Sequence, residues 1–140
     1  MTPEMRRYLN GPRRYFEIFM ALAALYFGTG LLSDFAGDND PLYWMYEWSR
    51  AEHLGFAMAI FGAAVIHGIG IRWNGRGGWK SPMLRVLSMV LLAGLFCVMA
   101  FAGSGTSAFR TYSIFTFLYA YSAYSAAQDF YLAWKGHAYA

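Results

Sequence analysis

The fold is decided by one stretch, Arg50 to Trp73, which reads RAEHLGFAMAIFGAAVIHGIGIRW. It is apolar over the length that a helix needs to cross the ~30 Å hydrocarbon core of a bilayer. His53 and His67 lie fourteen positions apart within it. At 100° and 1.5 Å per residue, their rings project within about 40° of each other and lie roughly 21 Å apart along the axis. We therefore expect one histidine near each surface of the membrane.

The composition of the whole chain indicates the same class of protein. Of its 140 residues, 58% are apolar, 20% are aromatic and only 14% are charged. An ordinary soluble domain is about 25% charged and about 45–50% apolar. The net charge of +3 comes from few, scattered residues, so we expect no nucleic-acid partner. The single cysteine, Cys97, rules out a disulfide framework or a thiolate metal site within one chain.

Three further apolar runs accompany the first, and together they predict a single transmembrane domain that covers residues 1–140. The predicted fold is all-α, an integral membrane bundle of four transmembrane helices. The spans are expected at about 15–32, 51–71, 83–102 and 109–134. Ser81-Pro82 is a favourable start for the third span, because Ser caps helices and Pro is tolerated in a first turn.

Basic residues are unevenly divided between the two ends of these spans. Arg50 and Arg110 fall at one end. The other end has nine: Arg6, Arg7, Arg13, Arg14, Arg72, Arg76, Lys80, Arg85 and Lys135. Lys and Arg near span ends favour the cytoplasmic side. We therefore predict a multi-pass membrane protein, surrounded by lipid, with both termini in the cytoplasm.

The connection between the first two spans, residues 33–52, is acidic and aromatic. Four aromatic residues are crowded into six positions: Tyr43, Trp44, Tyr46 and Trp48. Their amphipathic rings favour the headgroup level of a bilayer. This predicts a short interfacial helix around residues 42–49.

Small residues follow helical spacing on one side of the second span. They are Gly55, Ala59, Gly62 and Ala63. In lipid, small residues let helix backbones approach closely, and packing replaces the missing hydrophobic drive. We predict that this smooth face is a helix contact surface beside a stripe that contains both histidines.

A polar line follows helical spacing in the last span. Its members are Tyr121, Tyr124, Ser125 and Gln128. Hydrogen bonds between helices, or between copies of the protein, would explain such a line. If several copies assemble, the line could border a water-filled path, whereas a single four-helix bundle has no room for a pore.

The histidine pair has two interpretations. Its fourteen-residue spacing resembles that on the haem-binding helices of cytochrome b proteins, which would make His53 and His67 ligands of b-type haem. In that family a second helix supplies another such pair, and no second pair exists in this sequence. The preferred interpretation has no cofactor: each histidine lies near a span end and pairs with Glu52 or with loop carbonyls.

The remaining polar residues give no support for catalysis. The sequence has no nucleophile elbow, no HExxH pair and no phosphate-binding glycine loop, so we expect that the protein is not an enzyme. Glu17 follows Arg13 and Arg14 by four and three residues, which predicts an interfacial ion pair. No acid is expected near the middle of a span, which weighs against an ion-coupled transporter.

The stretch from Gly70 to Arg85 carries the elements Asn74-Gly75-Arg76, Trp79, Ser81-Pro82 and Leu84-Arg85. This pattern is similar to one in small multispanning membrane proteins encoded by tailed bacteriophages. The resemblance implies a location in the host inner membrane and a role in lysis, in phage exclusion or in DNA entry. We expect a non-enzymatic protein that acts by helix packing and oligomerisation, holin-like or excluding other phages. The alternative is an accessory or haem-bearing subunit of a larger membrane complex.

Overall fold

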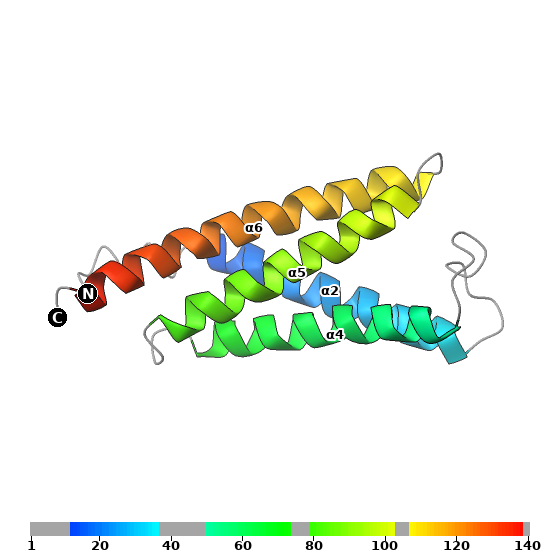
Figure 1. Ribbon diagram of the computed structural model, residues 1–140, viewed down its shortest axis with the longest axis horizontal. Helices are drawn as coiled ribbons and strands as arrows, with labels where there is room; N and C mark the ends of the chain where they lie inside the picture. Colours follow the sequence, from blue (N-terminus) through cyan, green and yellow to red (C-terminus); the bar gives the residue numbers. More distant parts are fainter. Residues whose placement is uncertain (1–11, 37–49, 74–78, 103–106, 139–140) are drawn as a thin grey trace.

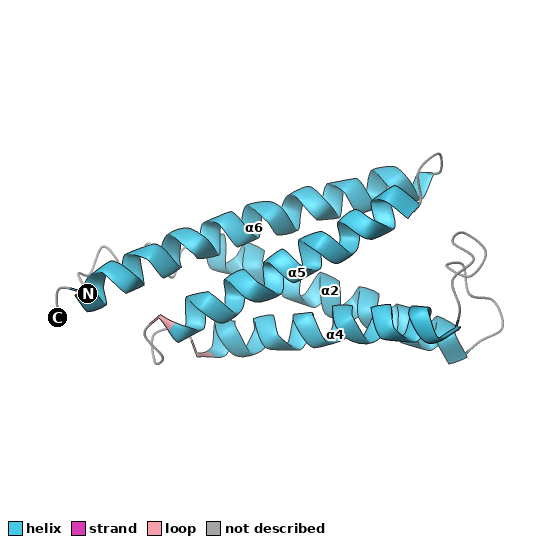
Figure 2. Ribbon diagram, in the orientation of Figure 1, coloured by secondary structure: helices cyan, strands magenta, loops and turns pink. Residues whose placement is uncertain are grey.

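The computed structural model describes residues 12–36, 50–73, 79–102 and 107–138. Four α-helices occupy these ranges: α2 (Pro12–Ala36), α4 (Arg50–Arg72), α5 (Lys80–Ala102) and α6 (Ser107–Ala138) (Figure 1). Of the described residues, only Trp73 and Trp79, at the turn between α4 and α5, are not helical (Figure 2). The prediction of an all-α protein is confirmed. The interfacial segment with Tyr43, Trp44, Tyr46 and Trp48 lies outside the described residues.

Three of the helices are long and apolar enough to cross a membrane. The qualifying segments are Arg14–Leu32, Ala51–Arg72 and Lys80–Phe101, which contain the first three predicted spans, apart from the last residue of the third. The last helix, α6, is the longest, but it does not meet the same criterion. Its tyrosine, serine and glutamine residues lower its hydropathy, and four of them form the predicted polar line.

The helices pack mainly in the order in which they follow one another in the sequence. The most extensive contact joins α5 to α6, followed by those of α2 with α4 and α4 with α5, whereas α2 and α6 touch little. The start of α2, the end of α4, the start of α5 and the end of α6 lie together at one end of the bundle (Figure 1). We call this the α4–α5 turn end.

Each helix contributes large or small apolar side chains to one continuous core. The ring of Phe96 on α5 lies within this core. Its centroid is 5.1 Å from the ring centroids of Phe27 and Tyr119 and 5.2 Å from that of Phe115. The Tyr119 hydroxyl donates to the main-chain oxygen of Met20 at 3.1 Å. This bond gives the polar end of a buried tyrosine the partner it requires.

The face that α4 buries is the histidine stripe, with His53, Ala57, Ile60, Ala64 and His67 all buried. The predicted contact face beside it is less buried. Of its members, Ala63 is buried, Ala59 and Gly62 are half-buried, and Gly55 is exposed. A Cβ atom added to Gly55 or Gly62 would meet nothing within 4 Å. Within the chain, α4 therefore buries the histidine stripe and Ala63, while Gly55 and Gly62 have open space beside them.

α2 and α4 approach each other closely at Gly28. A Cβ atom at this position would lie 3.1 Å from the main-chain nitrogen of Phe61 and 3.2 Å from its Cα. These are backbone atoms, which cannot rotate away as a flexible side chain can. Gly28 therefore sets the spacing between the two helices.

We expect Gly28→Ala to lower the free energy of unfolding by about 1–3 kcal/mol, because the added methyl group overpacks the α2–α4 contact. Gly30→Ala is the matched control, since a Cβ atom at Gly30 meets nothing within 4 Å. The control should be neutral or slightly stabilising, as alanine favours helices over glycine. Denaturant unfolding in detergent, followed by circular dichroism, measures both. Equal effects of the two substitutions would contradict the close approach.

Candidate functional site

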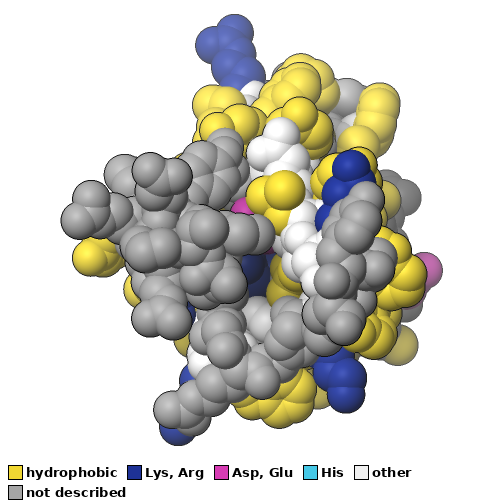
Figure 3. Space-filling view, turned by 90° about the vertical axis from the view of Figure 1, so that its left-hand side faces the viewer, with side chains coloured by type: hydrophobic (Ala, Val, Ile, Leu, Met, Phe, Trp, Pro, Cys, Tyr) yellow, Lys and Arg dark blue, Asp and Glu magenta, His cyan; other side chains and the backbone are white. Residues whose placement is uncertain are grey.

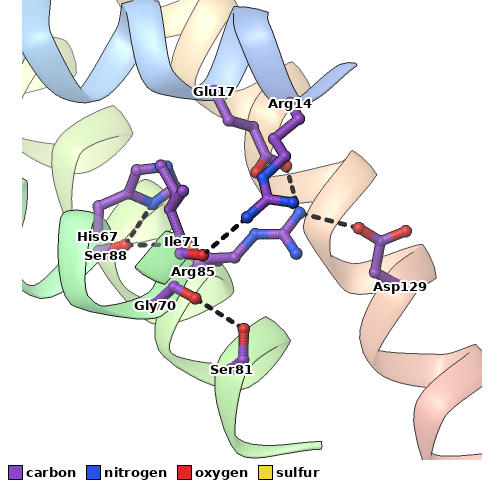
Figure 4. A network of polar contacts seen from close by, with 9 residues as sticks. All are labelled: Arg14, Glu17, His67, Gly70, Ile71, Ser81, Arg85, Ser88 and Asp129. Carbon is purple, nitrogen blue, oxygen red and sulfur yellow. Dashed lines mark hydrogen bonds and ion pairs between the residues drawn. The ribbon is translucent and has the colours of Figure 1, made fainter. Parts of the chain in front are cut away.

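Arg85 lies in the second turn of α5 and bridges two other helices. Its Nη2 donates to Glu17 Oε1 of α2 at 2.5 Å and to Asp129 Oδ2 of α6 at 2.8 Å (Figure 4). The three residues are 4%, 3% and 9% exposed, respectively. We call Glu17, Arg85 and Asp129 the ionic cluster. Such a group of buried, mutually paired ionisable residues in an otherwise apolar bundle is a candidate functional site.

The helix arrangement brings these three side chains to the same depth. Glu17 lies five residues after the start of α2, and Arg85 lies five residues after the start of α5. Five residues correspond to about 7.5 Å along a helix axis. Because α6 runs antiparallel to α5, Asp129 in its last third reaches the same level. The cluster therefore lies inside the bundle near the α4–α5 turn end.

Two features of the α4–α5 turn hold Arg85 in place. A Cβ atom at Gly70 would lie 2.9 Å from Cγ of Arg85, so the glycine makes room for the arginine stem. Ser81 was expected to cap α5, but α5 begins one residue earlier, and Ser81 Oγ donates to the main-chain oxygen of Gly70 at 2.7 Å. This hydrogen bond joins the end of α4 to the start of α5.

His67 lies beside the cluster and is fully buried. Its Nδ1 is 2.9 Å from Ser88 Oγ, and the Ser88 hydroxyl donates to the main-chain oxygen of Arg85 at 3.0 Å (Figure 4). A hydroxyl has one proton, so Ser88 accepts from His67, and the neutral ring carries its proton on Nδ1. Its Nε2 is then an acceptor, and it has no hydrogen-bond partner within the described ranges.

His53 lies near the opposite end of α4 and is also buried. Its Nε2 donates to the main-chain oxygen of Leu31 on α2 at 3.2 Å. Ligation of a haem iron through this nitrogen would require that hydrogen bond to be given up. Among the described residues, no group of three or more His, Cys, Asp or Glu side chains converges in a way that could hold a metal ion.

The predicted polar line of α6 divides between two faces. Tyr121 and Tyr124 are 58% and 63% exposed, and Gln128 is half-buried. Ser125 is buried and lies on the inward face with Ser122 and Asp129. Helical spacing places neighbouring positions on different faces, and the inward polar face of α6 is the one that reaches the ionic cluster.

The sequence interpretation of Glu17 was incomplete, because its buried ion pair is with Arg85, sixty-eight residues later in the chain. The prediction with Arg13 and Arg14 considered only neighbours on one helix. Arg14 is half-buried, and its Nη2 lies 3.4 Å from the main-chain oxygen of Ile71. The available signal was that Glu17, Arg85 and Asp129 each interrupt an otherwise uncharged run near the same end of the predicted bundle.

Comparison with known proteins does not assign the cluster. No protein-family model, curated protein or solved structure matches the chain. The similarity of the Gly70 to Arg85 stretch to phage membrane proteins therefore stays a prediction. What the protein does must be inferred from the cluster and from the outer surface of the helices.

We expect Arg85→Met to lower the free energy of unfolding by about 3–5 kcal/mol, because it leaves two buried carboxyl groups without their cationic partner. The triple variant Glu17→Gln, Arg85→Met, Asp129→Asn should recover part of this loss. Arg72→Met is the control, since Arg72 is an exposed arginine at the same end of the bundle. Denaturant unfolding in detergent measures all three. Indistinguishable stabilities of Arg85→Met and Arg72→Met would contradict a buried ion pair.

Proposed function

We propose that the chain is a four-span protein of the bacterial inner membrane that acts without catalysis, by associating with further copies of itself and altering the permeability of the bilayer. The observation that carries the membrane location is the reversed distribution of polarity. Charged residues of three helices meet in the interior, while large apolar side chains face outward. Among the latter are Phe19, Leu22, Met58, Leu87, Val90, Val98, Phe101 and Phe117.

A view onto the α4–α5 turn end illustrates this distribution. Where grey atoms do not cover the view, hydrophobic side chains lie along much of the perimeter, basic side chains lie at several points of the rim, and acidic and basic atoms are visible toward the middle (Figure 3). A soluble protein would expose the charges and bury the large apolar groups. Hydrocarbon as the surrounding solvent makes the observed arrangement favourable.

The packing of α6 supports a fourth crossing. α6 runs beside α5 along most of its length, and these two helices make the most extensive contact in the bundle. If α5 crosses the bilayer, a helix packed along it must cross as well. Its inward serines and Asp129 are then shielded from lipid by the bundle.

Charge placement supports cytoplasmic termini. In the described helices, Arg14, Arg72, Lys80 and Lys135 lie toward the α4–α5 turn end, whereas Arg50 and Arg110 lie at the opposite end. Lys and Arg near span ends are enriched on the cytoplasmic side. Both the start of α2 and the end of α6 would then face the cytoplasm.

The outer face of α6 supports association between copies. Tyr121, near the middle of the helix, is 58% exposed, and Tyr124 and Tyr131 are 63% and 55% exposed. We call these three residues the tyrosine face. Tyr124 and Tyr131 also line a shallow groove with Gln128. Phenol hydroxyls that face hydrocarbon gain a hydrogen-bond partner when two such faces meet, and a ring of copies would line a polar path.

The test is expression of the gene alone in a bacterium, with a potential-sensitive dye and with mass measurement of the protein in native detergent. We expect depolarisation of the membrane and a mass of more than one chain. The double variant Tyr121→Phe, Tyr124→Phe should weaken association at least roughly tenfold, given about 0.6–2 kcal/mol for each of two interhelical hydrogen bonds. Both readouts should fall together.

Tyr26→Phe is the matched control, because Tyr26 is 83% exposed but lies on α2, away from the tyrosine face. It should leave the mass and the membrane potential unchanged. A monomeric protein whose expression leaves growth and potential unaffected would overturn the proposal. Equal loss in the control would show that association does not depend on α6.

A further inference from the structure

The ionic cluster contains two acids and one base. Glu17 Oε1 and Asp129 Oδ2 accept from the same nitrogen of Arg85, so the two carboxyl groups face each other across one guanidinium. All three side chains are at least nine-tenths buried. Like charges at such a separation repel strongly in a medium of low dielectric constant. One guanidinium balances only one of the two carboxylates.

The other ionisable groups around the cluster do not supply the second positive charge in the buried region. From α4, His67 faces it as a neutral ring with its proton on Nδ1. From α2, Arg14 lies one turn before Glu17 and attracts its carboxylate electrostatically. Arg14 is only half-buried, so solvent screens its charge more than that of the buried Arg85, and its Nη2 lies 3.4 Å from the main-chain oxygen of Ile71. From α5 and α6, the charged groups are Arg85 and Asp129 themselves.

The inward face of α6 offers acceptors for a protonated carboxyl group. Ser122 and Ser125 are 0% and 5% exposed, and their hydroxyl oxygens have no hydrogen-bond partner in the described part of the chain. Ser125 precedes Asp129 by four residues, so the two lie one above the other on the same helix face. A protonated carboxyl becomes a donor and needs an acceptor of this kind.

We infer that the ionic cluster is a binding site for one proton, shared between the carboxyl groups of Glu17 and Asp129. Arg85 and one carboxylate form the ion pair, and the proton neutralises the other carboxyl group. A proton fits better than a metal ion, because the guanidinium already occupies the space between the acids. Within the described helices, no set of three metal-ligating side chains converges there either.

The proposal is tested by infrared spectroscopy of the full-length protein in lipid nanodiscs at neutral pH. The wild type should show the carbonyl stretch of one protonated carboxylic acid. Glu17→Gln and Asp129→Asn should each abolish this band, because one remaining carboxylate and one guanidinium balance without a proton. Loss of the same band from two different substitutions distinguishes a shared proton from one that belongs to a single acid.

Glu52→Gln provides the matched control, since Glu52 is an exposed acid at the start of α4. It should leave the band unchanged. Circular dichroism and denaturant resistance of each variant separate loss of the proton from loss of the fold. Arg85→Gln, where it folds, should roughly double the band, because both acids are then neutral.

Three results would overturn the inference. The first is a wild-type spectrum without a protonated carboxyl band, including the case in which the proton resides on His67. The second is a band that survives either acid substitution. The third is a band that disappears when sodium replaces a bulky organic cation in the buffer, which would identify a metal ion as the ligand. The spectrum does not depend on association between copies, so it is independent of the permeability test.

Discussion

The bundle depends on one guanidinium nitrogen that serves three helices. α2 and α6 are joined by few direct contacts, and Arg85 Nη2 on α5 holds an acid from each of them. The hydrogen bond from Tyr119 to the main chain of Met20 is a second polar link between α2 and α6. Two ring contacts, Phe16 with Tyr121 and Phe27 with Tyr112, join the same helices. In hydrocarbon, water cannot replace the polar contacts when helices separate. The first and the last helix are therefore held together by polar and aromatic side chains rather than by close backbone packing.

The interior has two parts with different physical roles. Around Phe96, aromatic rings from three helices fill the middle of the bundle with apolar packing. At the α4–α5 turn end, the interior is polar. Gly70 leaves room for the stem of Arg85, and Ser88 hydrogen-bonds both the main chain of Arg85 and the ring of His67. The apolar part contributes buried apolar surface and rigid packing. The polar part fixes how deeply each helix sits relative to the others, because the three charged groups must meet at one level.

Apolar run length was sufficient to predict the four helices, and three of them have the length and hydropathy of membrane spans. The site could not be predicted as fully, because it depends on relative helix depth and rotation. Glu17 has nearby arginines on its own helix, and nothing local indicates that its buried partner is Arg85. The histidine stripe and the smooth face of α4 are adjacent, so a small rotation decides which of them is buried. Likewise, Ser125 is next to Tyr124 in sequence, yet Ser125 is buried and Tyr124 is exposed.

The position of the ionic cluster determines which side of the membrane could exchange protons with it. Glu17 and Arg85 lie about 7.5 Å inside their helix ends at the α4–α5 turn end, near the half-buried Arg14. Toward the other end, the interior passes through the aromatic packing around Phe96, and among the helix residues whose burial is described, no carboxyl group beyond Phe96 is buried. A chain of proton carriers across the bundle would need such groups at intervals. A proton bound at the ionic cluster would therefore exchange with the solution at the α4–α5 turn end.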